Sequence, residues 1–596
     1  MNRVSFFLLS LTALLLSACT STAPANPASS RGPLTAQAAT TYYVDSVSGV
    51  DSNSGTSLNA PWKTLGKVNG RSFASGDTVS FKRGSSFSGT ILTLQSAGVT
   101  LNAYGSGAKP LFKNPGGLKV LEISAGGVTV DGLAFNDTTT FSSFGGVEYE
   151  NSGAVRIAQG ADSVTVKNSE FYGVGLGIKS YGNFTNISGN YFHDLKIAYR
   201  DSSQSYGAVG ISLNNSNAEV AYNTFFNCRS TDSPYGADGG VIEIEGFSNP
   251  KNNIYIHHNT SRNSQGFLEV TETSSSDVTL AYNLSDDYQH FLAFDTTTRP
   301  NNYKVEHNTV IRTRSDQAIT VFATLYYREV AASPSSSWLS VTNNIFYTPA
   351  AKVFRGTYSY SDFNYPHSNN LFYDGSSDPT GYGLGSGDLN ANPLFVSSSD
   401  FHLSGASPAI NAGLNLGYTF DLDGNSVPYG GAPDMGAYEY QSAPSSGGGS
   451  SNLIGNPGFE SSSSLDSPWY TESGGSGYFG VDAGTGASRS GANNAWIFTS
   501  SSNWQAIKQN VSVSANTNYT FSVWIRNSGN FTGGYFGAKT TAGTVLGETT
   551  FGAASSYTQY SVSFNSGSST TVVLHTGYYG PGADSWAQLD DWTLSQ

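Results

Sequence analysis

Val128–Phe135 reads Val-Thr-Val-Asp-Gly-Leu-Ala-Phe, and Val164–Phe171 repeats the pattern as Val-Thr-Val-Lys-Asn-Ser-Glu-Phe. Apolar and polar residues alternate in both stretches, as in a β-strand, and a turn and an apolar residue follow. The unit returns at intervals of 22 to 36 residues around seven asparagines, Asn190, Asn223, Asn259, Asn283, Asn308, Asn344 and Asn370. A strand-sized unit that recurs in this way predicts a solenoid.

The type of repeat predicts a right-handed parallel β-helix. Leucine-rich repeats require a leucine ladder and WD propellers require Trp-Asp pairs, and the sequence has neither pattern. Asparagine suits the corners of a β-helix because it tolerates left-handed backbone angles. Its amide can also hydrogen-bond from one coil to the next.

The composition agrees with an all-β protein that has many turns. The 596 residues include 68 Gly, 35 Tyr and 34 Phe, and only 12% are charged. Aromatic and β-branched residues recur throughout, which argues against a disordered chain. The net charge of −14 repels nucleic acid and anionic membranes, so we expect neither as a partner.

The N-terminus reads as an export signal. Arg3 precedes an apolar run, and Leu-Ser-Ala-Cys ends at Cys19. This segment resembles a bacterial lipobox, which implies acylation of Cys19; ordinary cleavage after Ala39 is the alternative. We expect a signal peptide over 1–19 and a cell-surface or extracellular protein that touches the membrane only through this lipid anchor. Cys228 then has no disulfide partner and is expected to be buried.

Two low-complexity stretches divide the rest of the chain. Residues 20–40 are rich in Ser, Pro, Ala and Thr and are expected to form a flexible tether, and residues 441–451 form a Ser/Gly linker. The predicted folded parts are the β-helix over 41–440 and a β-sandwich over 452–596.

Family resemblance supports this division. Residues 43–65, which contain Tyr43-Val-Asp and Pro61-Trp-Lys-Thr-Leu, resemble the opening of secreted right-handed β-helix proteins. Residues 392–440, which end in Asp434-Met-Gly-Ala-Tyr-Glu-Tyr, are similar to the segment that closes such helices. The resemblance implies a fold rather than one activity, because these families include hydrolases and lyases.

The second part resembles the jelly-roll carbohydrate-binding modules of glycanases, through Asn452-Leu-Ile-Gly-Asn-Pro-Gly-Phe-Glu460 and Gln588-Leu-Asp-Asp-Trp-Thr-Leu594. The resemblance implies a structural Ca²⁺ at Glu460 and Asp590, and a polysaccharide partner. Alternation along residues 519–526 places Trp524 on the outer face, where it offers a flat platform for a sugar ring. The further aromatic candidates are Trp496, Trp504, Tyr535 and Tyr578.

Four carboxylates fall in strands of three consecutive coils, where residues i and i+2 share a face. The expected inward pairs are Leu176/Ile178, Val209/Ile211, Ile242/Ile244, Leu268/Val270, Leu292/Phe294 and Ile319/Val321. One outward column then contains Gly177, Gly210, Glu243, Glu269, Ala293 and Thr320, preceded by Arg156. The neighbouring column contains Lys179, Ser212, Glu245, Thr271, Asp295 and Phe322. Asp238 is a fifth candidate.

Carboxylates stacked this closely raise one another's pKa, as a general acid requires. Glu243 and Glu269 are expected roughly 5 Å apart, and Glu269 and Asp295 roughly 8 Å apart. Retaining glycosidases place their carboxyls about 5–5.5 Å apart and inverting ones about 6.5–9.5 Å apart. We favour inversion by Glu269 and Asp295, in undecided order, with Glu243 and Glu245 tuning them or binding sugar hydroxyls.

Other residues around this cluster are candidates for substrate contact. The small side chains of Gly177 and Gly210 leave space for a cleft. His290 and Arg312 lie at the edges of coils near the cluster and are expected to contact substrate. The cations at Lys179 and Arg156 are suited to binding a uronate.

Three functions remain open. The first is a glycoside hydrolase, which needs no cofactor. The second is a Ca²⁺-dependent polysaccharide lyase, because Glu243-x-Glu245 followed by Lys251 resembles the alginate lyase and chondroitinase B family. In that family an Arg follows one coil later, whereas this chain has Thr271. The third is a non-catalytic glycan-binding surface protein whose carboxylates bind Ca²⁺.

Two further expectations concern metal and assembly. His257 and His258 are adjacent on a predicted strand, so one is expected to face inward and one outward, without a shared metal. A β-helix buries its coils on one another, so we expect a monomer.

Overall fold

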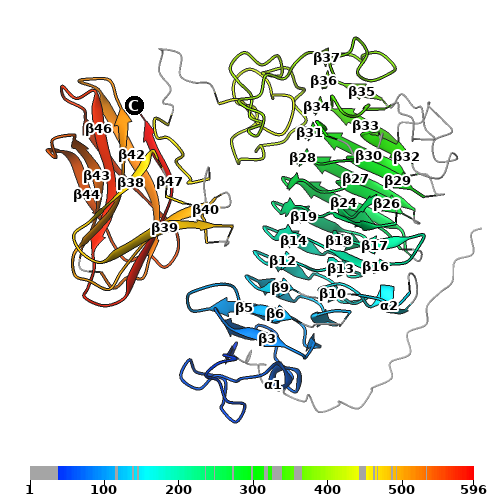
Figure 1. The fold of residues 1–596 in the computed structure, drawn as a ribbon, viewed down its shortest axis with the longest axis horizontal. Helices are drawn as coiled ribbons and strands as arrows, with labels where there is room; N and C mark the ends of the chain where they lie inside the picture. Colours follow the sequence, from blue (N-terminus) through cyan, green and yellow to red (C-terminus); the bar gives the residue numbers. More distant parts are fainter. Residues whose placement is uncertain are drawn as a thin grey trace, which may run out of the picture. The chain divides into compact units, whose positions relative to one another are not determined.

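The computed structural model describes residues 38–596 except 114–117, 137–139, 144–146, 235, 247–248, 272–273, 297–299, 315–319, 325–337, 355–365, 442–451, 461–463, 466, 485–486, 491–492, 532 and 596. Cys19, the signal peptide and most of the predicted tether lie outside the described residues. The strands run from β1 to β37 in the first part and from β38 to β47 in the second (Figure 1). The predicted fold class, a parallel β-helix followed by a β-sandwich, is confirmed.

Three parallel sheets form the walls of the β-helix, and the chain visits them in a fixed rotation. In the described residues the first sheet contains β1 (Thr41–Val44), β2 (Thr78–Lys82), β5 (Thr100–Tyr104), β8 (Thr129–Asp131), β11 (Thr165–Lys167), β14 (Asn186–Ser188), β19 (Ala218–Ala221), β24 (Lys251–His257), β27 (Ser275–Ala281), β30 (Asn301–Glu306), β33 (Leu339–Thr342) and β35 (His367–Ser368).

The second sheet, again within the described ranges, contains β3 (Ser86–Ser88), β6 (Leu111–Lys113), β9 (Ala134–Asn136), β12 (Glu170–Tyr172), β15 (Tyr191–His193), β20 (Thr224–Phe226), β25 (Thr260–Arg262), β28 (Leu284–Asp286), β31 (Thr309–Ile311), β34 (Ile345–Tyr347), β36 (Leu371–Tyr373) and β37 (Leu389–Asn390). The third, which we call the site sheet, contains β4 (Leu92–Leu94), β7 (Leu121–Ile123), β10 (Val155–Ile157), β13 (Leu176–Ser180), β18 (Val209–Leu213), β23 (Gly240–Ile244), β26 (Leu268–Thr271), β29 (Leu292–Asp295) and β32 (Phe322–Thr324).

Insertions precede several strands of the site sheet. The short helix α2 (Val147–Glu150) precedes β10, the hairpin β16 (Ile197–Arg200)–β17 (Ser205–Gly207) precedes β18, and the hairpin β21 (Ser230–Ser233)–β22 (Gly236–Asp238) precedes β23. The helix α1 (Leu65–Asn69) lies near the start of the β-helix. Within the described ranges, no helix combines the length and apolar character needed to cross a bilayer.

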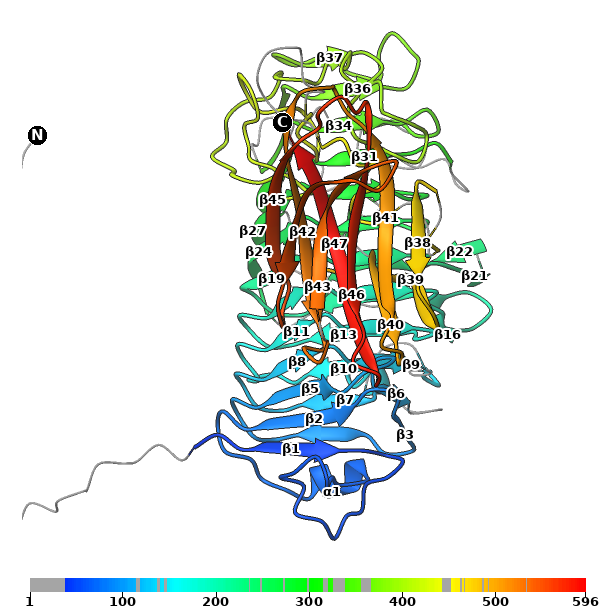
Figure 2. The same cartoon turned by 90° about the vertical axis from the view of Figure 1, so that its left-hand side faces the viewer.

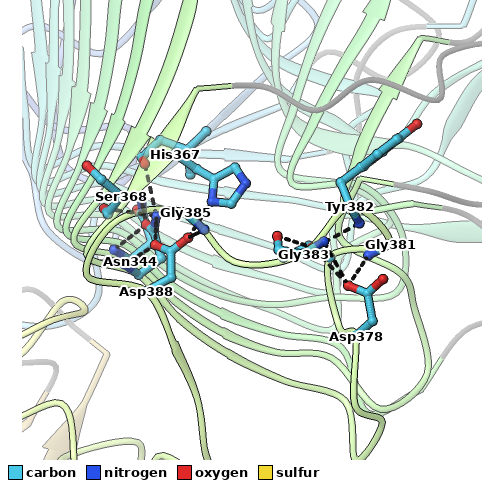
Figure 3. A network of polar contacts seen from close by, with 12 residues as sticks. Asn344, His367, Ser368, Asp378, Gly381, Tyr382, Gly383, Gly385 and Asp388 are labelled. Atoms are coloured by element: carbon cyan, nitrogen blue, oxygen red, sulfur yellow. Dashed lines mark hydrogen bonds and ion pairs between the residues drawn. The ribbon is translucent and has the colours of Figure 1, made fainter.

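An asparagine ladder occupies the corner between the first and second sheets, as the sequence predicted. From Asn223 to Asn370, each amide oxygen accepts the backbone N–H and the side-chain NH2 of the preceding ladder asparagine, beginning with Asn190. The ladder ends at Asp388, whose Oδ1 accepts the backbone N–H of Asn370 at 2.8 Å. Asp388 also accepts from Gly385 and contacts His367 (Figure 3).

The residue before each ladder asparagine takes the left-handed backbone conformation, even where its side chain is bulky. Tyr222, His258, Tyr282 and His307 have φ between 53° and 56°. Left-handed angles disfavour such side chains, and ring stacking offsets this cost: the centroids of Tyr282 and His307 are 4.6 Å apart.

The closing segment, residues 391–440, packs on the end of the β-helix through two apolar clusters that include Ile311, Ile345 and Leu371. Three of its carboxylates are almost fully buried: Asp421, Asp434 and Glu439. Their carboxylate oxygens accept hydrogen bonds mainly from backbone N–H groups, among them those of Asn411, Asn425 and Tyr429. We call these three residues the closing carboxylates.

The predicted strand register is right for most coils of the site sheet and wrong at two. Val209 pairs with Gly240, and Leu292 pairs with Phe322, each shifted from the expected partner. Both errors follow an insertion. At β23 the shift is two residues, which alternation cannot reveal, whereas at β32 it is three residues, which exchanges the inward and outward side chains. Phe322 is therefore buried rather than outward, and Thr320 is not in the carboxylate column. Ile319 lies outside the described residues.

The predicted space at Gly177 and Gly210 is also wrong. Built Cβ atoms would lie 2.7 Å from the ring of Phe192 and 2.9 Å from that of Phe225, which are both core residues. The glycines therefore face the core. Leu176 and Val209, expected to face inward, pack instead under the insertions with Phe141, Tyr149 and Tyr206.

The β-sandwich consists of two five-stranded antiparallel sheets (Figure 2). One contains, in the described residues, β38 (Trp469–Ser473), β41 (Trp504–Ser512), β46 (Thr571–Tyr579), β43 (Gly533–Thr540) and β44 (Val545–Phe551). The other contains β39 (Gly477–Ala483), β40 (Asn493–Thr499), β47 (Ser585–Ser595), β42 (Asn518–Asn527) and β45 (Thr558–Asn565). The predicted alternation along β42 is confirmed, because Tyr519, Phe521, Val523 and Ile525 are buried.

Candidate active site

One outward column of the site sheet gathers charged and polar side chains from successive strands. Glu243 of β23 pairs directly with Glu269 of β26, as the sequence predicted. The column as the register defines it is Glu122, Arg156, Lys179, Ser212, Glu243, Glu269, Ala293 and Ala323. Lys179 and Ser212 thus share a column with the two glutamates, which corrects the expected assignment to the neighbouring one.

The two cations of this column are paired with carboxylates. Arg156 Nη1 lies 2.7 Å from Glu122 Oε1, and Arg156 Nε donates to the carbonyl of Glu150. Lys179 is fully buried, with its Nζ 3.3 Å from Glu245 Oε1 and 3.4 Å from the centre of the Tyr149 ring. Neither cation is presented openly to a substrate.

Glu245 is the most enclosed carboxylate of the cluster, with 4% of its side chain exposed. It accepts hydrogen bonds from Tyr149, Ser212 and Tyr206, in addition to its ion pair with Lys179. Burial of a carboxylate is costly unless donors surround it, and here four do. Donors of this kind favour the charged form of a carboxylate.

Glu269 is the opposite case. Burial raises the pKa of its carboxyl well above the ordinary value, and the charges of Glu243, Asp295, Asp238 and Glu245 raise it further. Its side chain keeps 27% of its surface exposed, so Glu269 is not closed off from solvent. Glu269 is thus a partly accessible carboxylic acid that holds its proton at a higher pH than a free glutamate.

His290 supports Glu269 from the neighbouring coil. Its Nε2 lies 3.6 Å from Glu269 Oε2, and burial lowers its pKa to about 3, so the imidazole is neutral. Gly266 makes room for the ring, because a Cβ there would lie 2.4 Å from His290 Nε2. Arg312 is fully buried and donates to the carbonyls of Ser285 and His290. Arg312 was expected to contact substrate, but it holds the turn that carries His290.

The remaining candidates lie around this pair. Asp295, on β29, pairs with Thr271 and is therefore one strand and two residues from Glu269, as expected. Asp238 ends the hairpin strand β22 and accepts from Ser205 Oγ at 2.5 Å. Lys251 is buried, and its Nζ donates to the carbonyls of Gly246 and Asn249. Burial lowers the pKa of Lys251 to about 8.

The sequence did not point to Tyr149 and Tyr206, although both contact the cluster. Each sits in an insertion outside the repeat, on α2 and β17 respectively, where no periodicity guides an assignment. Only their aromatic character in a stretch before a site-sheet strand was available as a signal.

His257 and His258 do not face opposite ways as expected. Their Nδ1 atoms are 2.8 Å apart, and His257 Nε2 contacts Glu219 at 3.1 Å. No set of three or more His, Cys, Asp or Glu side chains is arranged as metal ligands among the residues that the structure describes.

The sandwich presents an aromatic group around Trp504. The Trp504 ring lies 5.1 Å from that of Tyr579 and 6.2 Å from that of Tyr535, and its indole N–H donates to Glu472. Tyr578, expected among the outer aromatics, is instead buried in the core.

Two other predicted aromatic platforms are partly covered. The guanidinium of Arg489 lies 3.9 Å from the centre of the Trp524 ring. Trp496 lies against Gly480, where a Cβ would come within 2.6 Å of the indole. Trp504 and Tyr535 are therefore the better-placed candidates.

The expected Ca²⁺ ligands lie close together around Gly458. A Cβ at Gly458 would lie 3.6 Å from Asp590 Oδ1, 3.5 Å from Asp591 Oδ1 and 3.7 Å from Glu460 Cγ. Burial and the charge of Asp591 raise the pKa of Asp590 to about 8. Backbone N–H groups of Arg489, Ser490 and Asp591 already donate to Asp590. The three carboxyl groups of Glu460, Asp590 and Asp591 can supply the negative charge that a cation needs. The oxygens of Asp590, however, already accept hydrogen bonds from the backbone.

Comparison with known proteins gives partial matches. No family model matches the chain. The chain is 40% identical over 92 residues to a lacto-N-biosidase from Bifidobacterium longum subsp. longum, which covers 14% of this chain and 6% of that protein's length. The chain therefore spans a small part of this curated relative.

Two solved structures resemble separate parts of the chain. The GH136 lacto-N-biosidase from Eubacterium ramulus is 16% identical over 56% of this chain and 67% of its own, with a TM-score of 0.30. The module TmCBM61, solved with β-1,4-galactotriose, is 18% identical over 24% of this chain and 97% of its own, with a TM-score of 0.21. At these TM-scores neither likeness bears on function.

Proposed function

We propose that this chain is an exported glycoside hydrolase whose reaction takes place at Glu269 on the site sheet. The observation that carries the proposal is the raised pKa of the partly exposed Glu269 carboxyl beside Glu243. A carboxylic acid that keeps its proton near neutral pH can protonate the oxygen of a leaving sugar. The match to a lacto-N-biosidase supports the same class of enzyme.

In the proposed reaction Glu269 gives its proton to the glycosidic oxygen as the bond to the anomeric carbon breaks. Asp295, one strand and two residues away, takes a proton from the water that attacks that carbon. The separation of roughly 8 Å leaves room for this water and implies inversion. Glu243 supplies the fixed negative charge that keeps Glu269 protonated before the reaction.

The contacts of the basic residues favour hydrolysis over the lyase alternative. A lyase needs a base near the sugar, but the Nζ of Lys251 faces two backbone carbonyls. Lys179 and Arg156, the cations suited to a uronate, are each paired with a glutamate. We therefore propose a glycan without acidic groups as the substrate.

We also propose that the sandwich binds glycan through Trp504, Tyr535 and Tyr579, and a structural Ca²⁺ through Glu460 and Asp590. Acylation of Cys19, and with it a surface location, remains a proposal from the sequence. So do the monomeric state and the boundaries of the domains.

The test is a glycan screen of the full chain that reads reducing ends and the ultraviolet absorbance of an unsaturated product in parallel. New reducing ends without absorbance, lost in both Glu269→Gln and Asp295→Asn, are the expected result. Absorbance that disappears with a chelator would establish the lyase instead. Binding without cleavage would establish a glycan-binding protein. Formation of a retained anomer would assign Glu243, not Asp295, as the partner of Glu269.

A further inference from the structure

Two insertions that are far apart in the sequence meet at the same buried carboxylate. Tyr149 lies on α2 and Tyr206 on β17, and their rings touch edge to face with centroids 5.1 Å apart. Both hydroxyls donate to Glu245. Both rings also belong to one apolar cluster, with Phe141 and Val209, on the outside of the site sheet.

The two tyrosines differ in their relation to Glu243. The Tyr206 hydroxyl lies 3.2 Å from Glu245 Oε1 and also 3.2 Å from Glu243 Oε2. A phenol has one proton to donate, so only one of the two carboxylates receives it at a time. Glu245 is already supplied by Ser212, Lys179 and Tyr149. The hydrogen bond from Tyr206 therefore stabilises Glu243 more than it stabilises Glu245.

Tyr206 remains a donor over the whole range of working pH. It is buried, and burial together with the charge of Glu243 raises the pKa of its hydroxyl well above the ordinary value. A neutral donor aimed at a carboxylate favours the charged form of that carboxylate.

We propose that Tyr206 is a positioning residue: it gives its hydroxyl proton to Glu243 and holds this carboxylate charged beside Glu269. The inference rests on the proposed hydrolase function. It explains how two neighbouring glutamates keep different protonation states, because the donor sits on Glu243 and a neutral imidazole sits beside Glu269. Carboxyl pairs of glycosidases need this separation.

The test compares Tyr206→Phe with Tyr149→Phe. The two variants each lose one hydroxyl at Glu245 and keep the ring in the same apolar cluster. Without this donor the proton of the pair spends part of its time on Glu243, so we expect Tyr206→Phe to lower kcat about tenfold with little change in KM. In Tyr149→Phe the donor to Glu243 is retained, so the fall in kcat should be smaller.

A second readout does not depend on activity. In protein labelled with ¹³C at the glutamate carboxyls, with Glu243 assigned from Glu243→Gln, Tyr206→Phe should raise the titration midpoint of Glu243. If Tyr206→Phe does not fold, fluorotyrosine at position 206 donates more strongly and should lower that midpoint.

The outcomes separate the two proposals. A Glu243 midpoint that stays unchanged in Tyr206→Phe overturns the role of Tyr206, whatever the activity. If the Glu243 midpoint shifts in Tyr206→Phe but the wild-type chain cleaves no glycan, the role of Tyr206 stands and the proposed hydrolase function is rejected.

Discussion

Glu243 and Glu269 occupy the same position on adjacent strands of the site sheet, so their side chains leave the backbone about 4.8 Å apart. The imidazole nearest to Glu269, that of His290, is neutral and does not offset the charge. Like charges this close destabilise the folded state unless one of them is protonated. The pair therefore lowers the free energy of unfolding, and it keeps a proton on Glu269.

The first prediction concerns this cost. Glu269→Gln removes the cost of keeping this carboxyl protonated and should raise the free energy of unfolding at neutral pH by about 1 kcal/mol, while activity falls by about 10²–10⁴-fold. Urea unfolding and a glycan assay measure the two effects. Glu219→Gln, a substitution away from the site sheet, serves as the control. A destabilised Glu269→Gln would show that the carboxylate contributes to folding.

The second prediction concerns the space for His290. Gly266→Ala places a Cβ 2.4 Å from His290 Nε2, and Arg312 prevents the turn from moving away. Overpacking of this kind costs about 1–3 kcal/mol, and we expect activity to fall about tenfold. In the control Gly240→Ala the nearest atom is 3.7 Å away, an ordinary contact. Equal stability and activity of the two variants would contradict the assignment of His290.

The third prediction concerns pH. Burial raises the pKa of Asp434 to about 6 and that of Glu439 to about 7, above their values in the unfolded chain. The folded state therefore binds more protons, so this stability is present in acid and is lost as the pH rises through 6 and 7. Urea unfolding at pH 5 and pH 8 should show a loss that is smaller in Glu439→Gln. An equal loss of unfolding free energy in the wild-type protein and in Glu439→Gln would contradict the role of Glu439.

The fourth prediction concerns the ladder. Asn283 accepts from Asn259 and donates to Asn308 and to the carbonyl of Ile256. Asn283→Ala removes the partner of the buried backbone N–H of Asn259 and the donor to the Ile256 carbonyl, whereas the Asn259 amide and Asn308 Oδ1 keep other partners. At about 1–3 kcal/mol for each group left unpaired, we expect a loss of about 2–5 kcal/mol. The control Asn390→Ala removes one exposed hydrogen bond and should cost under about 1 kcal/mol. Chemical unfolding of both variants measures the difference.

The fifth prediction concerns the sandwich. Trp504→Ala removes the ring that groups with Tyr535 and Tyr579, so binding to an insoluble glycan should weaken by about 1–3 kcal/mol. Trp524→Ala, whose ring is stacked with Arg489, should have a smaller effect. Pull-down at several glycan concentrations measures both. A larger loss of glycan binding in Trp524→Ala than in Trp504→Ala would show that the binding surface lies on the sheet that contains β42.

Alternation and the recurring asparagines were sufficient to predict the β-helix, the ladder and the adjacency of Glu243 and Glu269. They were not sufficient for register beyond an insertion: β23 is displaced by two residues, which keeps every side chain on its face, and β32 by three, which does not. Gly177 was misassigned because Gly177 and Ile178 both face the core, so strict alternation fails at the start of this strand.

Contacts made by insertions were not predictable at all. Tyr206 reaches Glu243 from a hairpin whose fold depends on tertiary packing against Leu176 and Val209. The burial of Arg312 could not be foreseen either, because its hydrogen-bond partners are backbone carbonyls whose direction the sequence does not encode locally.

The asparagine ladder fixes one corner of each coil, and α2, β16–β17 and β21–β22 all enter before strands of the site sheet, away from that corner. Scaffold and recognition are therefore separable in this molecule. A loop of different length can be grafted in front of β18 while the amide stack keeps the coils aligned, provided that Tyr206 is retained. The same solenoid can serve as an interchangeable frame for loops that select other sugars.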